Sequence, residues 1–506
     1  MKLKDLAAAI PGNLRAVAVG DGETAIESLS YDSRQVFLGV GFICLKGEKS
    51  DGHDFSIDAA HRGAAAFIIN RDRVKDFANL HLPFITVSNT RAAMPYIASA
   101  FYGDPTRHFD LVGITGTNGK TTCSFMLAAI WNAEGDKTGV IGTIGASVNG
   151  IPFPTNWTVS TTPEALDLQQ FFAQLKRDHV ERVALEVTSI AIDQERTAAC
   201  HFNTAIYTNL TQDHLDYHGS MAEYEASKAR LFLEYPSAFE NGFVAVINAD
   251  DPAGSRIAAR SKALGIQTVT YGINELNVNF RATGLSAKSE SSDFMLQEGY
   301  SSYPVHLPVG GLFNVSNALA AIATARTRNI EIDIVQKGLA RLGPVPGRFE
   351  LVPSPGKRFH VFVDYAHTPD GLENVLKSAR ALSPKRLIVV FGCGGNRDRT
   401  KRARMGKIAA DLADVVIVTS DNPRNEDPEF IVEEILAGID GGKENARVHV
   451  HIDRHDAIRS TICDLAAPGD LIIIAGKGHE TYQIVKDQTF PFDDRQVVVE
   501  ALKSCS

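Results

Sequence analysis

The chain has 506 residues, of which 44% are hydrophobic and 22% are charged, and its formal net charge is −9 at pH 7. Because a single core stops growing near about 250–300 residues, we expect about three domains of a soluble globular protein. The acidic balance without a long basic run argues against a nucleic-acid partner, and no apolar run approaches the ~18–20 residues of a membrane span. We therefore expect a cytoplasmic protein without membrane insertion. We also expect it to be a monomer.

Six cysteines are scattered along the chain, and none forms a CxxC motif. The sequence thus predicts neither a zinc site nor a disulfide framework, but separate thiols of a reducing compartment. The N-terminal segment MKLKDLAAAIPG has a short apolar stretch that Asp5 interrupts, so it predicts a small amphipathic helix rather than a signal peptide.

The first predicted domain covers residues 1–105 and ends in a turn at 103–105. Apolar runs predict three strands, at 41–45, 64–69 and 84–87, and a helical pattern covers 57–62. Two polar clusters, at 31–34 and 47–53, predict surface turns when these residues are considered alone.

The second predicted domain covers 106–343 and begins with the stretch Phe109–Thr122, FDLVGITGTNGKTT. A strand, a glycine-rich turn and a helix start in this order predict a phosphate-binding loop, because backbone N–H groups and the helix dipole favour an anion there. The Lys120 side chain can reach terminal phosphates, and the Thr121 hydroxyl can bind Mg²⁺. A strict GxxxxGK[ST] pattern needs glycine where this chain has Ile114, so an ordinary strand–helix turn stays an alternative.

Strand-like runs alternate with helical stretches through most of this second domain. The runs lie at 138–141, 183–187, 204–207, 243–247 and 267–271, and helices are predicted at 163–177 and 222–234. The alternation favours βαβ units and a mainly parallel sheet. The segment 272–308 lacks helical periodicity and is predicted to be rich in β-strand.

The third predicted domain covers 344–506. Its strand-like runs lie at 361–363, 386–391, 415–419, 448–452 and 471–475, with room for a crossover helix in each gap, which predicts a doubly wound sheet. Four runs end in polar clusters, at 364–367, 392–399, 420–424 and 476–480. Each cluster alone could be a routine turn. Because ligands bind at the carboxyl ends of strands in such sheets, we expect the four clusters to share one site.

Polar residues also follow strands of the second domain. Glu186 ends an apolar run, where an unpaired carboxylate is costly to bury, and near the phosphate loop it would bind Mg²⁺. The stretch 208–219 holds two histidines and two aspartates, which favours a metal or phosphate site. Lys228 lies on a predicted helix, and the residues alone indicate an ordinary exposed lysine.

Seven segments together resemble the Mur ligases of peptidoglycan synthesis: GITGTNGKTT, TNLTQDHLDYHG, YEASK, GLFNVSN, GRFE, DYAHTPD and SDNPRNEDP. The resemblance spans all three predicted domains in a consistent order. It implies an α/β protein with a small N-terminal UDP-binding domain, a central P-loop ATP-binding domain with a parallel sheet, and a C-terminal Rossmann-like amino-acid-binding domain. It also implies an ATP-dependent, ADP-forming ligase that joins an amino acid to a nucleotide-linked peptide through an acyl phosphate.

The resemblance implies roles for individual residues around ATP. The nucleotide would be bound by Gly116, Thr117, Asn118, Gly119, Lys120, Thr121, Thr122, Asn314, Asn317, Arg348 and Asp364. Thr121 and Glu186 would bind one Mg²⁺, and His214 would bind a second. Lys228 would carry a carbamate formed from CO₂, which turns this cation into an anion able to bind metal. The residues expected to be catalytic are therefore Lys120, Glu186, His214 and Lys228.

By the same resemblance, UDP-N-acetylmuramoyl-L-alanyl-D-glutamate would be bound by Tyr31, Ser33, Glu48, Lys49, Ser50, Ser160, Thr161, Thr162, Thr188, Gln194 and Arg196. The incoming amino acid would be bound by Arg397, Asp421, Asn422, Pro423, Arg424, Gly476 and Glu480. The tetrapeptide DNPR resembles the form in members that add meso-2,6-diaminopimelate rather than L-lysine. A guanidinium can bind the distal carboxylate that lysine lacks, and Glu480 could bind the ammonium beside it.

Some positions depart from the family pattern, namely Ser160, Thr188, Ile190 and Ala403. Ser160 and Thr188 keep a hydroxyl, whereas Ile190 cannot replace the hydrogen bonds of the usual histidine.

Addition of L-lysine is one alternative reaction. A folylpolyglutamate-synthase-like ligase is another, although about 105 residues precede the phosphate loop here. A nucleotide-switched binding module is a third, although a switch has no need of arginines and a glutamate at the strand ends of a separate sheet.

Overall fold

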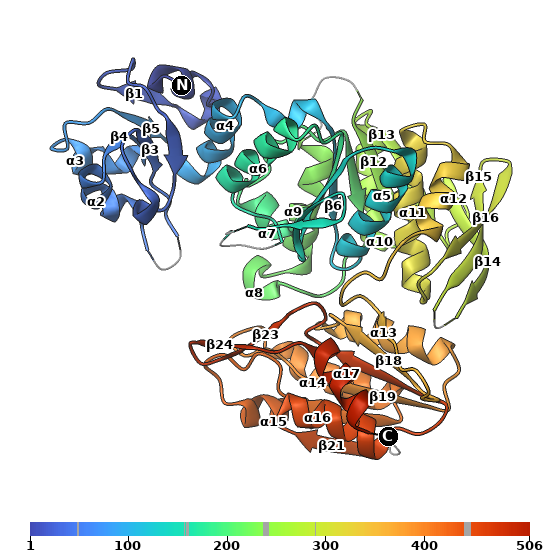
Figure 1. Ribbon diagram of the computed structural model, residues 1–506. Coiled ribbons are helices and arrows are strands. Elements are labelled where there is room, and N and C mark those ends of the chain that lie inside the picture. The colour runs from blue at the N-terminus through green and yellow to red at the C-terminus, as the bar shows by residue number, and fades with distance from the viewer. Residues whose placement is uncertain are drawn as a thin grey trace. The chain divides into compact units, whose positions relative to one another are not determined.

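The computed structural model describes residues 1–47, 50–155, 157, 161–235, 242–288, 290–439 and 447–505. The first of two compact units comprises Met1–Thr115, Asp136–Ala205 and Ser227–Phe243, and the second comprises Gly116–Gly135, Ile206–Ala226 and Val244–Ser506. Parallel strands alternate with helices in both units, which confirms the α/β class, whereas the three predicted domain boundaries stay a prediction (Figure 1). Within the described ranges, no helix is long and apolar enough to cross a membrane.

A five-stranded sheet begins the first unit, in the order β1-β5-β4-β3-β2, and all its strands are parallel except β1. Its elements are α1 (Leu3–Ala8), β1 (Val17–Val19), β2 (Ser28–Ser30), β3 (Val40–Ile43), α2 (Ser56–His61), β4 (Ala64–Asn70), α3 (Val74–Phe77), β5 (Phe84–Val87) and α4 (Thr90–Phe101). Along β4, Ala66 and Ile68 enter one core while Phe67 and Ile69 enter another, because successive strand residues point to opposite faces. The predicted strands and the N-terminal amphipathic helix are confirmed.

The rest of the first unit is built around β6 (Asp110–Thr115), which pairs in parallel with β10 (Arg182–Glu186). The neighbouring elements are β7 (Thr138–Gly142), β8 (Gly145–Val148), β9 (Ile151–Phe153), α6 (Ala165–Arg177) and α7 (Ser189–Asp193). β7 pairs in parallel with β10, and β8 and β9 extend it antiparallel. The chain passes to the second unit within β11 (Thr204–Tyr207) and returns within α9 (Met221–Leu233).

The second unit contains α5 (Lys120–Glu134), which follows the predicted phosphate loop. Its next elements are α8 (Leu215–His218), β12 (Val244–Asn248), α10 (Pro252–Ala263), β13 (Gln267–Gly272), β14 (Phe280–Ala287), β15 (Ser292–Glu298), β16 (Ser301–Leu307), α11 (Leu312–Thr327) and α12 (Ile332–Ala340). β14, β15 and β16 form an antiparallel extension, so the β-rich prediction for 272–308 is confirmed (Figure 1).

The C-terminal part of the second unit is a six-stranded sheet in the order β17-β18-β22-β19-β20-β21. Its elements are β17 (Glu350–Val352), β18 (His360–Asp364), α13 (Pro369–Ala381), β19 (Arg386–Phe391), α14 (Thr400–Leu412), β20 (Val415–Thr419), α15 (Pro428–Ile439), β21 (Arg447–His451), α16 (Arg454–Ser460), β22 (Asp470–Ala475), the hairpin β23 (Tyr482–Val485) and β24 (Gln488–Pro491), and α17 (Asp494–Ser504). Along β19, Leu387 and Val389 enter one core whereas Ile388 and Val390 enter the other. Helices therefore cover both faces, which confirms the doubly wound prediction.

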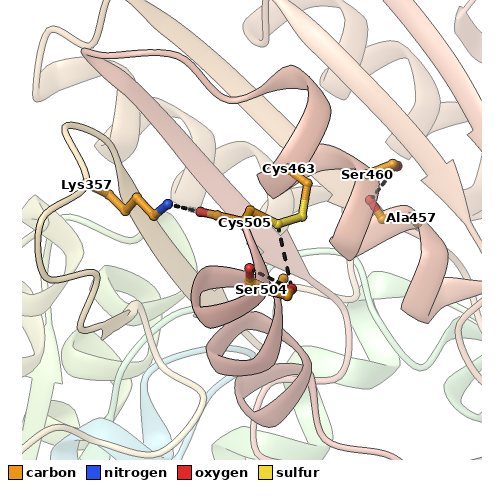
Figure 2. The surroundings of a disulfide bond; sticks show 7 residues. Lys357, Ala457, Ser460, Cys463, Ser504 and Cys505 are labelled. Atoms are coloured by element: carbon orange, nitrogen blue, oxygen red, sulfur yellow. Dashed lines mark hydrogen bonds between the residues drawn. A yellow bond between two sulfur atoms is a disulfide. The ribbon is translucent and has the colours of Figure 1, made fainter.

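A disulfide bond joins Cys463 to Cys505, so the prediction of separate thiols is wrong for these two residues (Figure 2). They are 42 residues apart in sequence, yet their Cα atoms are 5.3 Å apart. Tertiary folding brings them together, because α17 packs beside the short π-helix Thr461–Leu465. The other four cysteines are buried and are not disulfide-bonded.

A buried ion pair joins α16 to α17. Arg454 and Asp494 are both fully buried, and the guanidinium donates two hydrogen bonds to the carboxylate, each at 2.8 Å. A further hydrogen bond, at 2.9 Å, runs from Arg454 to the carbonyl of Ala475 at the end of β22. The pair thus connects the helices to a strand end of the C-terminal sheet.

We expect Arg454→Met to lower the free energy of unfolding by about 3–5 kcal/mol, because Asp494 would stay buried without its partner. The matched control is Lys377→Met, which removes an exposed ion pair to Glu373 and should change that free energy by no more than about 1 kcal/mol. Urea denaturation followed by circular dichroism measures both. Equal losses in the two variants would contradict the assignment of a buried, stabilising pair.

Candidate functional site

The predicted phosphate loop leads into α5. Gly119 is the N-terminal cap of this helix and has a φ of +88°, a left-handed conformation that glycine adopts readily. Lys120 begins the helix, and its Nζ donates hydrogen bonds to the carbonyls of Gly116 and Thr117, both at 2.9 Å. A helix N-terminus and an ammonium group therefore converge on the loop, an arrangement that favours phosphate.

Close packing requires glycine at two positions of this loop. A Cβ atom at Gly116 would lie 1.8 Å from Thr208 Oγ1, and one at Gly119 would lie 2.3 Å from Asn317 Oδ1. The Thr208 hydroxyl also donates a hydrogen bond to the Asn118 carbonyl at 2.6 Å. The polar stretch that begins at Thr208 thus contacts the loop directly.

Two asparagines of α11 lie buried near the start of α5. Asn317 Nδ2 is 3.3 Å from Asn314 Oδ1, and Asn314 Nδ2 donates to the Gly310 carbonyl at 2.7 Å. Cys123 Sγ of α5 lies 3.5 Å from the Asn317 carbonyl oxygen. The structure therefore brings Asn317 to the loop, with Asn314 beside it, and their role toward an adenine stays a prediction.

Arg348 contacts the loop from the C-terminal part of the second unit. Its Nη2 donates to Thr121 Oγ1 at 3.2 Å, and its guanidinium lies 4.5 Å from the centroid of the Tyr365 ring. Asp364, at the end of β18, accepts hydrogen bonds from two backbone N–H groups at 2.6 and 2.8 Å, one of them that of Phe349. Burial raises the pKa of Asp364, and the charge of Arg348 opposes that rise. Asp364 thus fixes the backbone next to Arg348.

Sequence reasoning missed Asp370, which lies in the first turn of α13. Its Oδ2 accepts hydrogen bonds from Asn118 Nδ2 at 2.7 Å, from Thr211 Oγ1 at 3.0 Å and from Asn374 Nδ2 at 3.0 Å. Burial raises its pKa. The available signal was an aspartate after Pro369 at a helix start, but helix capping is the ordinary reason for that pattern.

Glu186 is buried at the end of β10 in the first unit, and its carboxylate has partners. The backbone N–H of Thr143 donates to one oxygen at 3.0 Å, and the Thr143 hydroxyl donates to the other at 2.9 Å. A Cβ atom at Gly142 would lie 2.0 Å from Glu186 Oε1, so glycine is needed beside the carboxylate. The Thr143 hydroxyl is also 3.3 Å from that of Thr161.

Lys228 lies on α9 and is 1% exposed. The prediction of an exposed lysine, which was based on the residues alone, is therefore wrong. Its neighbours Ser227 and Ala229 are also buried, and such small side chains leave no apolar periodicity that marks the buried face. Burial at this position agrees with the special role that the family resemblance implied.

The four residues implied as metal ligands are divided between the units. Glu186 and Lys228 belong to the first unit, and Thr121 and His214 to the second, where His214 has a φ of +52° and lies 3.4 Å from Asp213. Among the described residues, one group has three possible ligand atoms within 4.8 Å of one another: Asp453, His455 and Asp456. All three are exposed and none was predicted, so this group says nothing about the implied magnesium ligands.

A second cluster of the first unit gathers around Thr162. Its hydroxyl donates to the Glu186 carbonyl at 2.9 Å and accepts from the Thr188 N–H at 3.1 Å. Arg196 donates to the Thr162 carbonyl at 2.8 Å and to Gln194 at 2.7 Å. Thr188 also caps α7, because its hydroxyl accepts from the N–H of residue 191 at 3.2 Å. The structure thus brings together four residues that the resemblance assigned to the sugar-peptide.

The N-terminal part of the first unit holds the residues implied for the uridine. The Tyr31 hydroxyl donates to Asp167 at 2.7 Å, and burial raises the pKa of Asp167 to about 6. Ser33 is buried, and Ser50 is exposed. Glu48 and Lys49 of this set lie outside the described residues, and so does Ser160, which the resemblance assigned to the sugar-peptide.

His53 corrects the prediction of a surface turn at 47–53. It is 1% exposed, its Nδ1 lies 2.5 Å from Asp51 Oδ1, and its Nε2 accepts from the Asn70 N–H at 3.0 Å. Arg73 donates to the second oxygen of Asp51 at 2.8 Å. The end of this segment is therefore anchored in the fold rather than exposed.

The polar clusters at the strand ends of the C-terminal sheet do come together, because β18, β22, β19 and β20 are adjacent strands. Arg424 Nη1 donates to the Gly395 carbonyl at 2.9 Å, and Asn422 Nδ2 donates to Glu480 Oε2 at 2.9 Å. The rings of Tyr365 and His479 lie 5.0 Å apart. These contacts connect all four clusters, as predicted, whereas their binding of an amino acid stays a prediction.

Two glycines let these clusters approach each other closely. A Cβ atom at Gly395 would lie 1.9 Å from the Pro423 carbonyl oxygen, and one at Gly476 would lie 2.6 Å from Asp421 Oδ2. Gly476 also has a φ of +116°. Any larger residue at either position would separate the strand ends that the candidate site needs.

Arg424 has a left-handed backbone, with a φ of +52°, which is uncommon for a residue other than glycine. Its N–H donates to the Ile484 carbonyl at 3.1 Å, and its carbonyl accepts from the Lys486 N–H at 2.7 Å. The hairpin β23–β24, which the sequence did not predict, therefore holds this backbone in place. Burial lowers the pKa of Arg424, and the positive charge of exposed Arg397 lowers it further. A bound carboxylate would relieve that repulsion.

Three family models match this chain. They are described as "Mur ligase family, catalytic domain" over residues 25–102, "Mur ligase middle domain" over 114–325 and "Mur ligase, glutamate ligase domain" over 347–478. A relative from Syntrophomonas wolfei is 44% identical over 484 residues, which cover 96% of each chain, and it is named UDP-N-acetylmuramoyl-L-alanyl-D-glutamate–2,6-diaminopimelate ligase.

Solved structures give a similar result. One structure of a UDP-N-acetylmuramoyl-L-alanyl-D-glutamate–2,6-diaminopimelate ligase has a TM-score of 0.68 at 31% identity, covering 100% of this chain and 99% of the other. A folylpolyglutamate synthase from Mycobacterium tuberculosis, complexed with ADP and AMPPCP, has a TM-score of 0.63 at 21% identity and covers 76% of this chain and 92% of its own. The second likeness shows the fold alone.

We expect Gly119→Ala to weaken ADP binding by about tenfold or more, because the Cβ would clash with Asn317 and strain a left-handed backbone. Gly135→Ala at the other end of α5 is the matched control: its φ is +109°, but nothing lies within 4 Å of a Cβ there. Both variants should lose about 1 kcal/mol of stability, and only Gly119→Ala should lose affinity. Isothermal titration calorimetry measures the ADP affinity of both variants. Equal ADP affinities of Gly119→Ala and Gly135→Ala would contradict the assignment of this loop to phosphate binding.

Proposed function

We propose a specific reaction for this chain, which belongs to the Mur ligase family. The chain is a ligase, and we infer that it joins 2,6-diaminopimelate to UDP-N-acetylmuramoyl-L-alanyl-D-glutamate during peptidoglycan precursor synthesis. The observation that supports this substrate most directly is that the charges of both Arg397 and Glu480 act on the Arg424 guanidinium. The name of the relative at 44% identity supports the same choice.

ATP would drive the reaction. Its γ-phosphoryl group would pass to a carboxylate of the nucleotide-linked peptide, which gives ADP and an acyl phosphate. The amine of the incoming amino acid would then attack the acyl carbon, and the tetrahedral intermediate would expel phosphate as the amide forms. In this scheme the loop backbone at 116–122 and Lys120 hold the phosphates, and Arg348 adds a positive charge beside Thr121.

The candidate magnesium ligands fit a hard cation. Thr121 offers a hydroxyl and Glu186 a buried carboxylate, and Mg²⁺ prefers such oxygen ligands. His214 would contribute to a second ion. When bound, Mg²⁺ would neutralise the charge that develops on the phosphates.

Lys228 fits a carbamate because it is 1% exposed, and burial favours the neutral amine, which is the form that reacts with CO₂. Reaction of its neutral amine with CO₂ would form a C–N bond and release one proton. The resulting anion could bind metal, which the unmodified ammonium cannot.

Diaminopimelate would place its distal carboxylate between Arg424 and Arg397, and Glu480 would accept hydrogen bonds from the neighbouring ammonium. L-Lysine lacks that carboxylate, so it would leave the two guanidinium groups without an anion. A folylpolyglutamate-type substrate is less well supported, because that likeness rests on the fold and covers 76% of this chain. The test below compares L-lysine with diaminopimelate, and a folylpolyglutamate-type substrate would be indicated if neither amino acid supported phosphate release.

We place the reaction in the cytoplasm, where ATP and a nucleotide-linked precursor are available together. We also propose that the chain acts as a monomer, because the candidate ligands of every substrate come from this one chain. Gel filtration tests the second statement directly.

Arg424→Lys should raise the KM for diaminopimelate by about thirtyfold or more, because an ammonium cannot form the two parallel hydrogen bonds of a guanidinium. The KM for ATP should change little. Phosphate release with meso-diaminopimelate and with L-lysine, measured side by side, gives both parameters. The control is Arg447→Lys, an exposed arginine of the same sheet. If the wild-type enzyme used L-lysine as efficiently as diaminopimelate, the proposed substrate would be rejected.

Lys228→Ala should abolish turnover and recover part of it when acetate or propionate is added, because the acid replaces the missing carbamate. The matched control is Lys262→Ala, an exposed lysine of α10, which should stay active and show no response to the acid. Intact-protein mass spectrometry at neutral pH should show one added CO₂ in the wild type. Full activity of Lys228→Ala without acid would reject the carbamate.

A further inference from the structure

Lys477 is a fully buried cation that the proposed reaction does not use. It lies between Gly476 and Glu480, and its side chain is 0% exposed. Its Nζ donates hydrogen bonds to Glu480 Oε2 at 3.0 Å and to Asn422 Oδ1 at 3.2 Å. A buried ammonium is tolerated when it is paired in this way.

Asn422 closes the arrangement into a triangle. Its Nδ2 donates to the same Glu480 Oε2 at 2.9 Å, while its Oδ1 accepts from Lys477 and from the Ile484 N–H at 2.9 Å. The triangle thus joins the strand ends of β20 and β22 to the hairpin β23–β24. The aromatic ring of Tyr482, on β23, lies 5.6 Å from Lys477 Nζ.

The hydrogen bonds to the Glu480 side chain are unevenly divided between its two oxygens. Both donors, Lys477 and Asn422, reach Oε2, and within the described residues no side-chain or backbone hydrogen bond reaches Oε1. One oxygen therefore fixes the orientation of the carboxylate, and the other keeps its capacity to accept from a ligand.

We propose that Lys477 is a positioning residue for the incoming amino acid and acts through Glu480. This inference rests on the proposed function, in which Glu480 binds an ammonium group of diaminopimelate. Lys477 does not touch that substrate. It holds Glu480 in one orientation before the substrate arrives, so that the substrate ammonium does not have to order the carboxylate itself.

Lys477→Met removes the ammonium and keeps a side chain of similar length. We expect the KM for diaminopimelate to rise by about tenfold to a hundredfold, as expected for the loss of one charge-assisted hydrogen bond, while the KM for ATP stays within about twofold. A double-mutant cycle with Glu480→Gln tests whether the effect of Lys477 on the KM depends on Glu480. If Lys477 acts through Glu480, Lys477→Met should raise the KM by no more than about twofold further in the Glu480→Gln background.

Lys377→Met is the matched control, because it breaks an exposed Lys–Glu pair of the same part of the chain and should leave both KM values unchanged. If Lys477→Met does not fold, Lys477→Gln is measured by the same criteria, since its amide keeps one hydrogen-bond donor without the charge. An unchanged KM for diaminopimelate, or the same rise in the Glu480→Gln background, would overturn the proposal. Wild-type enzyme that releases no phosphate with diaminopimelate would instead reject the proposed function.

Discussion

Parallel strand pairing is the constraint on which the candidate amino-acid site depends. Because β18, β22, β19 and β20 are neighbours in one sheet and run in the same direction, their carboxyl ends meet at one edge. Four segments that are far apart in sequence therefore share one environment. Glycine at 395 and 476 removes the side chains that would separate them.

Charge sets the chemistry of both candidate sites in the second unit. At the loop, the Lys120 ammonium and the start of α5 favour phosphate, and Arg348 reaches the Thr121 hydroxyl. At the strand ends, burial and the positive charge of Arg397 each lower the pKa of Arg424. A ligand with a carboxylate at one end and an ammonium at the other would compensate both arginines and Glu480.

Much of the fold could be predicted because long apolar runs alternate with helical stretches, and the strands from β3 to β22 that were predicted are present. The missed elements are short or exposed: β1, β8, β9 and the hairpin β23–β24 carry few buried apolar residues, so periodicity gives no signal for them. Lys228 and His53 were misjudged for a related reason, since burial of a polar residue depends on partners that lie elsewhere in the chain. The sequence did not predict the disulfide between Cys463 and Cys505, because 42 residues separate the two cysteines.

By itself, the sequence determined the α/β class, the glycine-rich loop ahead of α5 and the polar strand ends, because local hydrophobic periodicity and glycine placement act over a few residues. It also carried the family motifs. Only the tertiary structure decided that Asp370 contacts the loop, that Lys477 is buried against Glu480, and that a hairpin fixes the backbone of Arg424. Those contacts join residues tens to hundreds of positions apart, and no local pattern encodes which distant partner a polar side chain will meet.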